Sequence, residues 1–206
     1  MRRNGSKMLR KRVAREAALL LYTSQEKEYK QAKQRAAQIL KTRVLPSNLE
    51  VTEELDRIAE EREGASRKSL LLRMRKEAQE IMDALKDYSP RLVGSVWRGT
   101  ARQNSDIDIQ TFSQDPIQVL NQLQKQSFKV KDSEWHSVTK KGRKQSSFHI
   151  HILLPSGDEA EVVVRSLNHL GQPERCEIYG DAKKGLKLHE LTEVLKEYPL
   201  QKFVPT

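Results

Sequence analysis

The sequence contains little of what characterises secreted and membrane proteins. It has one cysteine, Cys176, among 206 residues, which excludes an internal disulfide framework and a cysteine-rich zinc cluster. Its longest uninterrupted apolar run covers only residues 17–22, too short to span a bilayer or to form the core of a signal peptide. We therefore expect a cytoplasmic protein with no membrane partner.

The composition is that of a globular protein. Charged residues make up 32% of the chain and apolar residues 36%, a balance that differs from that of disordered chains. The length allows one sizeable core, or one domain with a helical appendage. An intracellular enzyme or a nucleic-acid-binding protein is the class that these features favour.

The formal net charge of +10 is concentrated at the N-terminal end. Residues 1–43 contain thirteen Lys and Arg against three Glu, so the rest of the chain is close to neutral. A localised positive field attracts polyanions, because contacts with phosphates release counterions. Two interpretations remain open for this segment: it binds RNA or DNA, or it is a solvated helix surface.

The first part of the sequence has the periodicity of helices. Apolar side chains recur every three to four residues over 9–20, 29–40 and 71–85. Ser47 and Glu50 form a capping-box pattern that predicts the start of another helix, and Gly64 predicts its end. We expect a basic helical N-terminal region over residues 1–64 and a second domain over residues 65–206.

Beyond Pro90 the pattern changes to that of strands. Residues 128–135 and 146–154 are expected to pair, and residues 160–164 form a β-branched run. Asp115 followed by Pro116 predicts the start of an intervening helix. A last strand is expected at 176–179 and a last helix at 186–195. Helices followed by a mixed sheet that helices flank define an α+β fold.

Two aspartates alternate with apolar residues in one of the expected strands. Asp106 and Asp108 would project from one face, while Ile107 and Ile109 point into the core. Two neighbouring carboxylates repel each other unless a cation lies between them, and Mg²⁺ prefers such hard oxygen ligands. The alternative is that both carboxylates are simply solvated near a strand end.

A phosphate-binding pattern precedes this strand and favours the metal interpretation. Glycine lets the backbone approach a phosphate closely, so the Gly94 amide and the Ser95 hydroxyl can both donate to phosphate oxygens. Arg98 and Arg102 supply positive charges that could clamp a polyphosphate. These four residues are the candidate nucleotide-binding residues.

These motifs resemble the signature of the DNA polymerase β-like nucleotidyltransferase superfamily. The signature is an apolar residue with Gly94–Ser95, a spacer of ten residues, and Asp106–Ile107–Asp108. The chain as a whole is similar to predicted prokaryotic nucleotidyltransferases. The resemblance implies a small mixed sheet, a nucleoside triphosphate substrate, here expected to be ATP, and two Mg²⁺ ions. It also implies transfer of a nucleoside monophosphate to a hydroxyl.

The superfamily uses a third carboxylate from a later strand, which is usually an aspartate. Glu161, at the start of the β-branched run, is the favoured candidate here, and Glu159 is the next. The resemblance implies that Asp106, Asp108 and Glu161 are catalytic and hold the metal ions. Glutamate is a departure from the pattern, because it places the carboxylate one methylene further from the backbone.

The acceptor of the nucleotide is less constrained by the sequence. The basic N-terminal helices favour an RNA 3′ end, as in tRNA. A protein side chain or a small molecule is an alternative acceptor. A different function also stays open, that of a catalytically inactive nucleic-acid-binding module. His149 and His151 alternate on one strand face, and they are open to interpretation as a metal pair, as ordinary strand residues or as contacts to a nucleotide.

Overall fold

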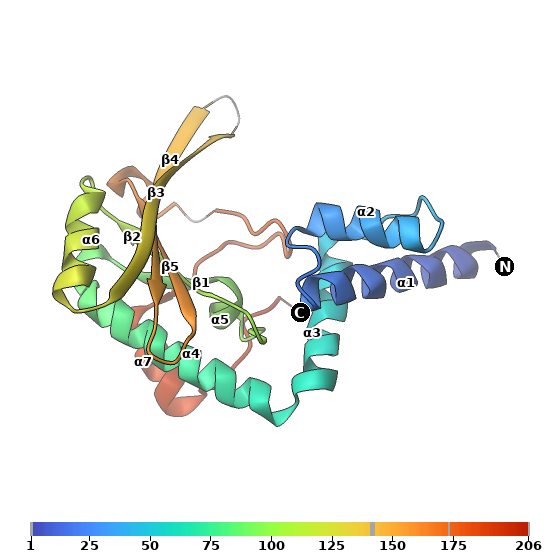
Figure 1. The fold of residues 1–206 in the computed structure, drawn as a ribbon, viewed down its shortest axis with the longest axis horizontal. Helices are drawn as coiled ribbons and strands as arrows, with labels where there is room; N and C mark the ends of the chain where they lie inside the picture. The colour runs from blue at the N-terminus through green and yellow to red at the C-terminus, as the bar shows by residue number, and fades with distance from the viewer. Residues whose placement is uncertain (1, 141–142, 173, 206) are drawn as a thin grey trace. The chain divides into compact units, whose positions relative to one another are not determined.

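The computed structural model describes residues 2–140, 143–172 and 174–205, which form two compact units (Figure 1). The first unit comprises Met1–Arg67 and Cys176–Gly180. The second comprises Lys68–Arg175 and Asp181–Thr206. No described helix is both long enough and apolar enough to cross a membrane.

The first unit contains three helices, α1 (Arg2–Tyr22), α2 (Tyr29–Ile39) and α3 (Asn48–Glu63). Small side chains dominate their shared core, including fully buried Ala17 and Ala36. The predicted capping box is confirmed, because the Glu50 amide donates to Ser47 Oγ at 3.1 Å and the Ser47 amide donates to Glu50 Oε2 at 2.7 Å. Gly64 ends α3 at a φ of 50°, as its position predicts.

The second unit is built on a six-stranded mixed sheet. The strand order is β3-β4-β5-β2-β1-β6, and only the β2–β5 pair is parallel among the described strands. The strands are β1 (Arg91–Val93), β2 (Ile107–Phe112), β3 (Lys129–Lys140), β4 (Arg143–Leu153), β5 (Glu159–Arg165) and β6 (Leu186–Lys187). The predicted α+β class and the predicted pairing of β3 with β4 are confirmed.

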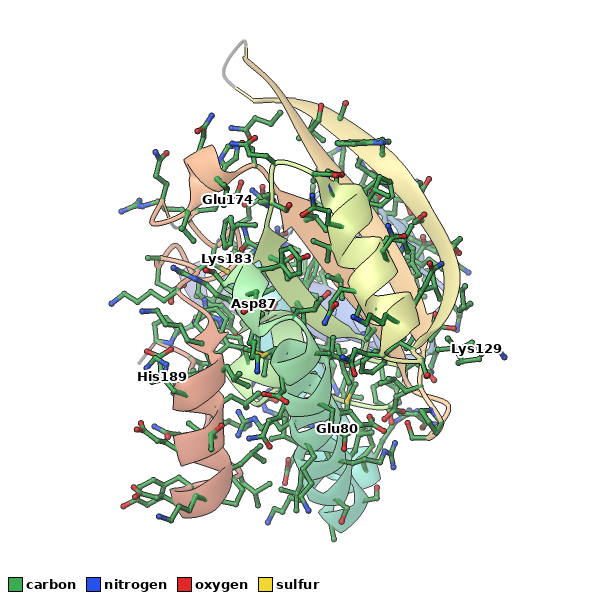
Figure 2. The ribbon with its side chains drawn as sticks, turned by 90° about the vertical axis from the view of Figure 1, so that its left-hand side faces the viewer. Glu80, Asp87, Lys129, Glu174, Lys183 and His189 are labelled. Carbon is green, nitrogen blue, oxygen red and sulfur yellow. The ribbon has the colours of Figure 1, made fainter. Side chains whose placement is uncertain are left out.

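Helices cover one face of this sheet and leave the other face polar. Side chains alternate along each strand, so Ile109, Ile150 and Val162 are buried on the same face. They share a core with apolar residues of three helices, which lie beside the sheet in Figure 2. These helices are α4 (Ala65–Ala84), α6 (Pro116–Lys125) and α7 (Leu188–Glu197). The predicted N-cap is confirmed, since Asp115 accepts from the Ile117 amide at 3.0 Å.

One local prediction was wrong. Residues 177–179 form a turn rather than a strand, because Gly180 takes a φ of 73° and its amide donates to the Cys176 carbonyl at 2.8 Å. The last strand is instead β6. A short helix, α5 (Gly94–Arg98), follows β1, and Gly99 ends it in the left-handed region.

Candidate active site

Gly94 lies directly against the carboxylate of Asp108. Strands β1 and β2 are antiparallel, with Val93 opposite Asp108, so the residue after β1 meets the Asp108 side chain. A Cβ atom placed on Gly94 would lie 1.8 Å from Asp108 Oδ2, and the φ of Gly94 is 69°. Both the space and the backbone conformation therefore require glycine. Ser95 follows at the start of α5 and is half-buried.

The parallel pairing of β2 with β5 brings the third carboxylate to this point. Asp108 and Glu161 are register partners, so their side chains leave the same face of adjacent strands. Asp106 and Glu159 precede them by two residues and share that face. Glu159 is exposed and pairs with Lys131 at 2.6 Å, whereas Glu161 is half-buried beside Asp108.

The pKa values of the two aspartates on this face are raised. Burial first, and then the negative charges of Glu161 and Asp106, raise the pKa of Asp108 to about 7, against the opposing effect of Lys183. The pKa of Asp106 is also raised, first by reduced hydration and then by Glu159 and Glu161. The protein's own cations therefore leave the negative charge of this face incompletely balanced.

Glu161 is held in place by a neighbouring strand. Its Oε1 lies 2.6 Å from Nδ1 of His149, on β4, and His149 Nε2 lies 2.8 Å from the hydroxyl of Ser147. The His149 ring also lies 4.2 Å from that of His136, between centroids. The sequence indicates that His149 and His151 share one face of a strand, but the contact of His149 with Glu161 depends on the register of β4 and β5.

The donor atoms of the site suit a hard divalent cation. In the part of the chain that the structure describes, no three or more His, Cys, Asp or Glu side chains converge as a ready-made metal cluster. Asp106, Asp108 and Glu161 nevertheless share one sheet face and offer carboxylate oxygens whose mutual repulsion a cation would relieve. These three residues are the ones that fit Mg²⁺.

Arg98 does not contact this face. It is 5% exposed, and its guanidinium donates to both carboxylate oxygens of Asp181, at 2.8 and 2.7 Å, and to the Phe203 carbonyl at 2.7 Å. The structure therefore gives Arg98 a role inside the fold, where it fastens α5 to the C-terminal segment, in place of the predicted contact with a polyphosphate. A buried guanidinium needs such partners, and a carboxylate and a carbonyl provide them.

Arg102 stays in the loop between α5 and β2. Its amide donates to Ser105 Oγ at 3.1 Å, and its guanidinium donates to the Gln103 carbonyl at 3.2 Å. The side chain is half-buried and, like Arg98, does not line the cavity beside Asp108. Of the four predicted nucleotide-binding residues, the structure brings Gly94 to the carboxylates and places Ser95 next to it in α5.

A cavity of about 210 Å³ opens beside the carboxylates. Gly94, Asp108 and Glu161 line one part of it, and Arg91 and Lys183 contribute positive charge elsewhere in its wall. Figure 2 labels Lys183 near Glu174, both on the segment that joins β5 to β6. The sequence did not indicate that Arg91 and Lys183 belong to the site, because only the folded chain places them in the same cavity as Asp108.

The chain belongs to the nucleotidyltransferase domain family. A model of that family matches residues 73–182, more than half of the sequence, and the matched segment contains all the predicted site residues. The family that the sequence motif resembled is therefore confirmed. No curated protein matches the chain.

Several solved structures show a limited likeness to this chain. One is Cid1, described for its RNA terminal uridylyl transferase activity, at 15% identity and a TM-score of 0.34, covering 50% of this chain and 32% of Cid1. Another is Cid1 with the UTP analogue UMPNPP, at 19% identity and a TM-score of 0.32, covering 48% and 31%. A third is the GLD-2/RNP-8 complex, at 19% identity and a TM-score of 0.32, covering 51% and 38%. This chain thus spans roughly a third of the length of those chains.

Proposed function

We propose that this protein is a metal-dependent nucleotidyltransferase that moves a nucleoside monophosphate from a nucleoside triphosphate, expected to be ATP, to an acceptor hydroxyl. One observation carries the proposal. Asp108 faces Glu161 across two parallel strands and lies against Gly94, and its pKa is raised to about 7. Such a strongly raised pKa at a carboxylate beside a cavity is typical of a functional site.

Different residues of the site would bind the metal ions and the phosphates. Asp106 and Asp108 would hold one Mg²⁺, and Glu161 would share a second. Bound Mg²⁺ neutralises the triphosphate and the departing pyrophosphate, and it lowers the pKa of the acceptor hydroxyl. The Gly94 amide and the Ser95 hydroxyl would donate to phosphate oxygens, and Lys183 would add positive charge on the cavity wall.

RNA is the acceptor that the charge of the first unit favours. Several of its arginines are already neutralised by acids of the same unit: Arg15, for example, pairs with Glu61 at 2.9 Å. Lys7 and Lys11 are exposed one helical turn apart on α1, and neither lysine forms an ion pair with a described residue. Their charges therefore remain for contacts with phosphates.

A transfer assay tests the proposed reaction. The chain is incubated with α-labelled nucleoside triphosphates, Mg²⁺ and total cellular RNA, and the labelled product is identified. We expect labelled RNA 3′ ends, and we expect Asp108→Asn to abolish transfer. Label on another protein or on a small molecule would support the reaction but contradict an RNA acceptor. No transfer under any condition would leave a catalytically inactive nucleic-acid-binding module.

Salt dependence tests the role of the first unit. Each phosphate contact that is lost reduces the slope of log affinity against log salt by about one, so the double variant Lys7→Gln/Lys11→Gln should reduce it by roughly two. The matched control, Lys125→Gln/Lys129→Gln, removes two exposed lysines of the second unit and should leave the slope unchanged. Equal slopes for both variants would contradict RNA binding through α1.

A further inference from the structure

Three side chains on the polar face of the sheet form a continuous hydrogen-bonded chain. The Ser147 hydroxyl lies 2.8 Å from His149 Nε2, and His149 Nδ1 lies 2.6 Å from Glu161 Oε1. A carboxylate accepts hydrogen bonds only, so Nδ1 carries a proton, and in the neutral ring Nε2 is then an acceptor. The Ser147 hydroxyl therefore donates to His149.

This arrangement is the one that activates a hydroxyl as a nucleophile. A serine hydroxyl is a weak nucleophile unless a base beside it takes its proton, and the base is effective when a third group orients it. His149 and Glu161 occupy these two roles toward Ser147. Their side chains are 17% and 28% exposed, so the contact between them is shielded from most of the solvent.

The chain of contacts lies on the acceptor side of the proposed reaction. Strand order places Gly94 after β1, Asp108 on β2, Glu161 on β5 and His149 on β4, all toward one face. Neighbouring strands lie about 4.8 Å apart, so β2 and β4 are roughly 10 Å apart. Glu161 thus stands between the phosphate-binding end of the site and the Ser147 hydroxyl.

We propose that Ser147 is an acceptor of the nucleoside monophosphate, so that the protein nucleotidylates itself. This inference rests on the proposed function. Ser147 Oγ attacks the α-phosphorus of a nucleoside triphosphate, a new Oγ–P bond forms, and the bond to the bridging oxygen of pyrophosphate breaks. The hydroxyl proton passes to His149 Nε2, while Glu161 holds Nδ1. The products are a serine-linked phosphodiester and pyrophosphate.

The extra methylene of Glu161 has a function in this scheme. The carboxylate of a glutamate reaches further from its strand than that of an aspartate. In this structure that reach brings Oε1 to the ring of His149, which is the register partner of Val163 rather than of Glu161. The glutamate that replaces the usual aspartate thus contacts His149, and His149 in turn contacts the Ser147 hydroxyl.

The test is a self-labelling experiment on the full chain. The purified protein is incubated with Mg²⁺ and α-labelled ATP, and the labelled peptide is located by mass spectrometry. We expect one nucleoside monophosphate on Ser147 and at least a tenfold loss of label in Ser147→Ala. The control, Ser146→Ala, removes the next hydroxyl along β4, which pairs with Ser137 at 3.0 Å, and should keep the label. His149→Ala should reduce labelling although Ser147 is still present.

A parallel reaction with RNA separates this inference from the proposed function. If the wild-type chain labels RNA but not itself, the proposed function stands and the role of Ser147 is refuted. Label that persists in Ser147→Ala also refutes it. If neither RNA nor the chain is labelled, both proposals fail. Unfolding curves of each variant show whether a loss of label comes from a loss of fold.

Discussion

Replacing Asp108 with Asn should stabilise the second unit while it abolishes transfer. The Asp108 carboxylate accepts no hydrogen bond from the described residues, so the amide loses no such partner in the folded chain. It does lose the charge that burial, Glu161 and Asp106 destabilise. The variant removes an unfavourable electrostatic contribution and leaves the shape of the side chain nearly unchanged.

The size of the stabilisation expected for Asp108→Asn follows from the pKa of Asp108. It rises from 3.8 in the unfolded chain to about 7 in the folded one, which corresponds to about 4 kcal/mol as an upper bound. Between these two values the native state binds the proton more tightly than the unfolded state does. The stability of the wild-type chain therefore falls as pH rises through this window, and that of Asp108→Asn falls less.

The assay is urea unfolding in EDTA, monitored by tryptophan fluorescence, which is expected to change because Trp97 is buried in the second unit whereas Trp135 is already exposed. Near pH 8 the variant should be more stable by up to about 4 kcal/mol, and near pH 4 the two proteins should differ little. Equal stability near pH 8, or the same difference at both pH values, would refute the reasoning.

Two other substitutions test how the site is built. Gly94→Ala places a Cβ against Asp108 Oδ2 at a positive φ, so it should destabilise the chain by at least about 1 kcal/mol and abolish nucleotide binding, as measured by calorimetry. A stable variant that binds nucleotide would contradict the close packing at Gly94. Arg98→Met leaves Asp181 and the Phe203 carbonyl without their donor and should cost about 3 kcal/mol in urea unfolding, whereas Arg102→Met, a matched change in the adjacent loop, should cost much less. Equal losses would contradict the structural role of Arg98.

The sequence predicts the features that depend on neighbouring residues. The capping box of Ser47 and the N-cap of Asp115 are formed within one turn of helix, so spacing alone identifies them. The alternation of Asp106 and Asp108 with isoleucines likewise identifies a strand with one polar face. The Gly–Ser motif, ten residues before these aspartates, completes the pattern that indicates the family.

Features that depend on distant pairings could not be read from the sequence. Arg98 follows the Gly–Ser motif whether it points to a phosphate or into the fold, and its partner Asp181 lies 83 positions away. The contact of His149 with Glu161 is fixed by the register of two strands. Residues 176–179 have the composition of a strand, but a glycine in the left-handed region ends the run as a turn.

The central claim is that Asp106, Asp108 and Glu161 together hold a divalent cation beside Gly94. The most direct test of this claim is to measure Mn²⁺ binding by electron paramagnetic resonance, with and without a non-hydrolysable ATP analogue. The account predicts that the wild-type chain binds Mn²⁺ more tightly when the analogue is present, and that Asp108→Asn and Glu161→Gln each weaken this binding at least tenfold. Wild-type affinity in both variants would contradict it.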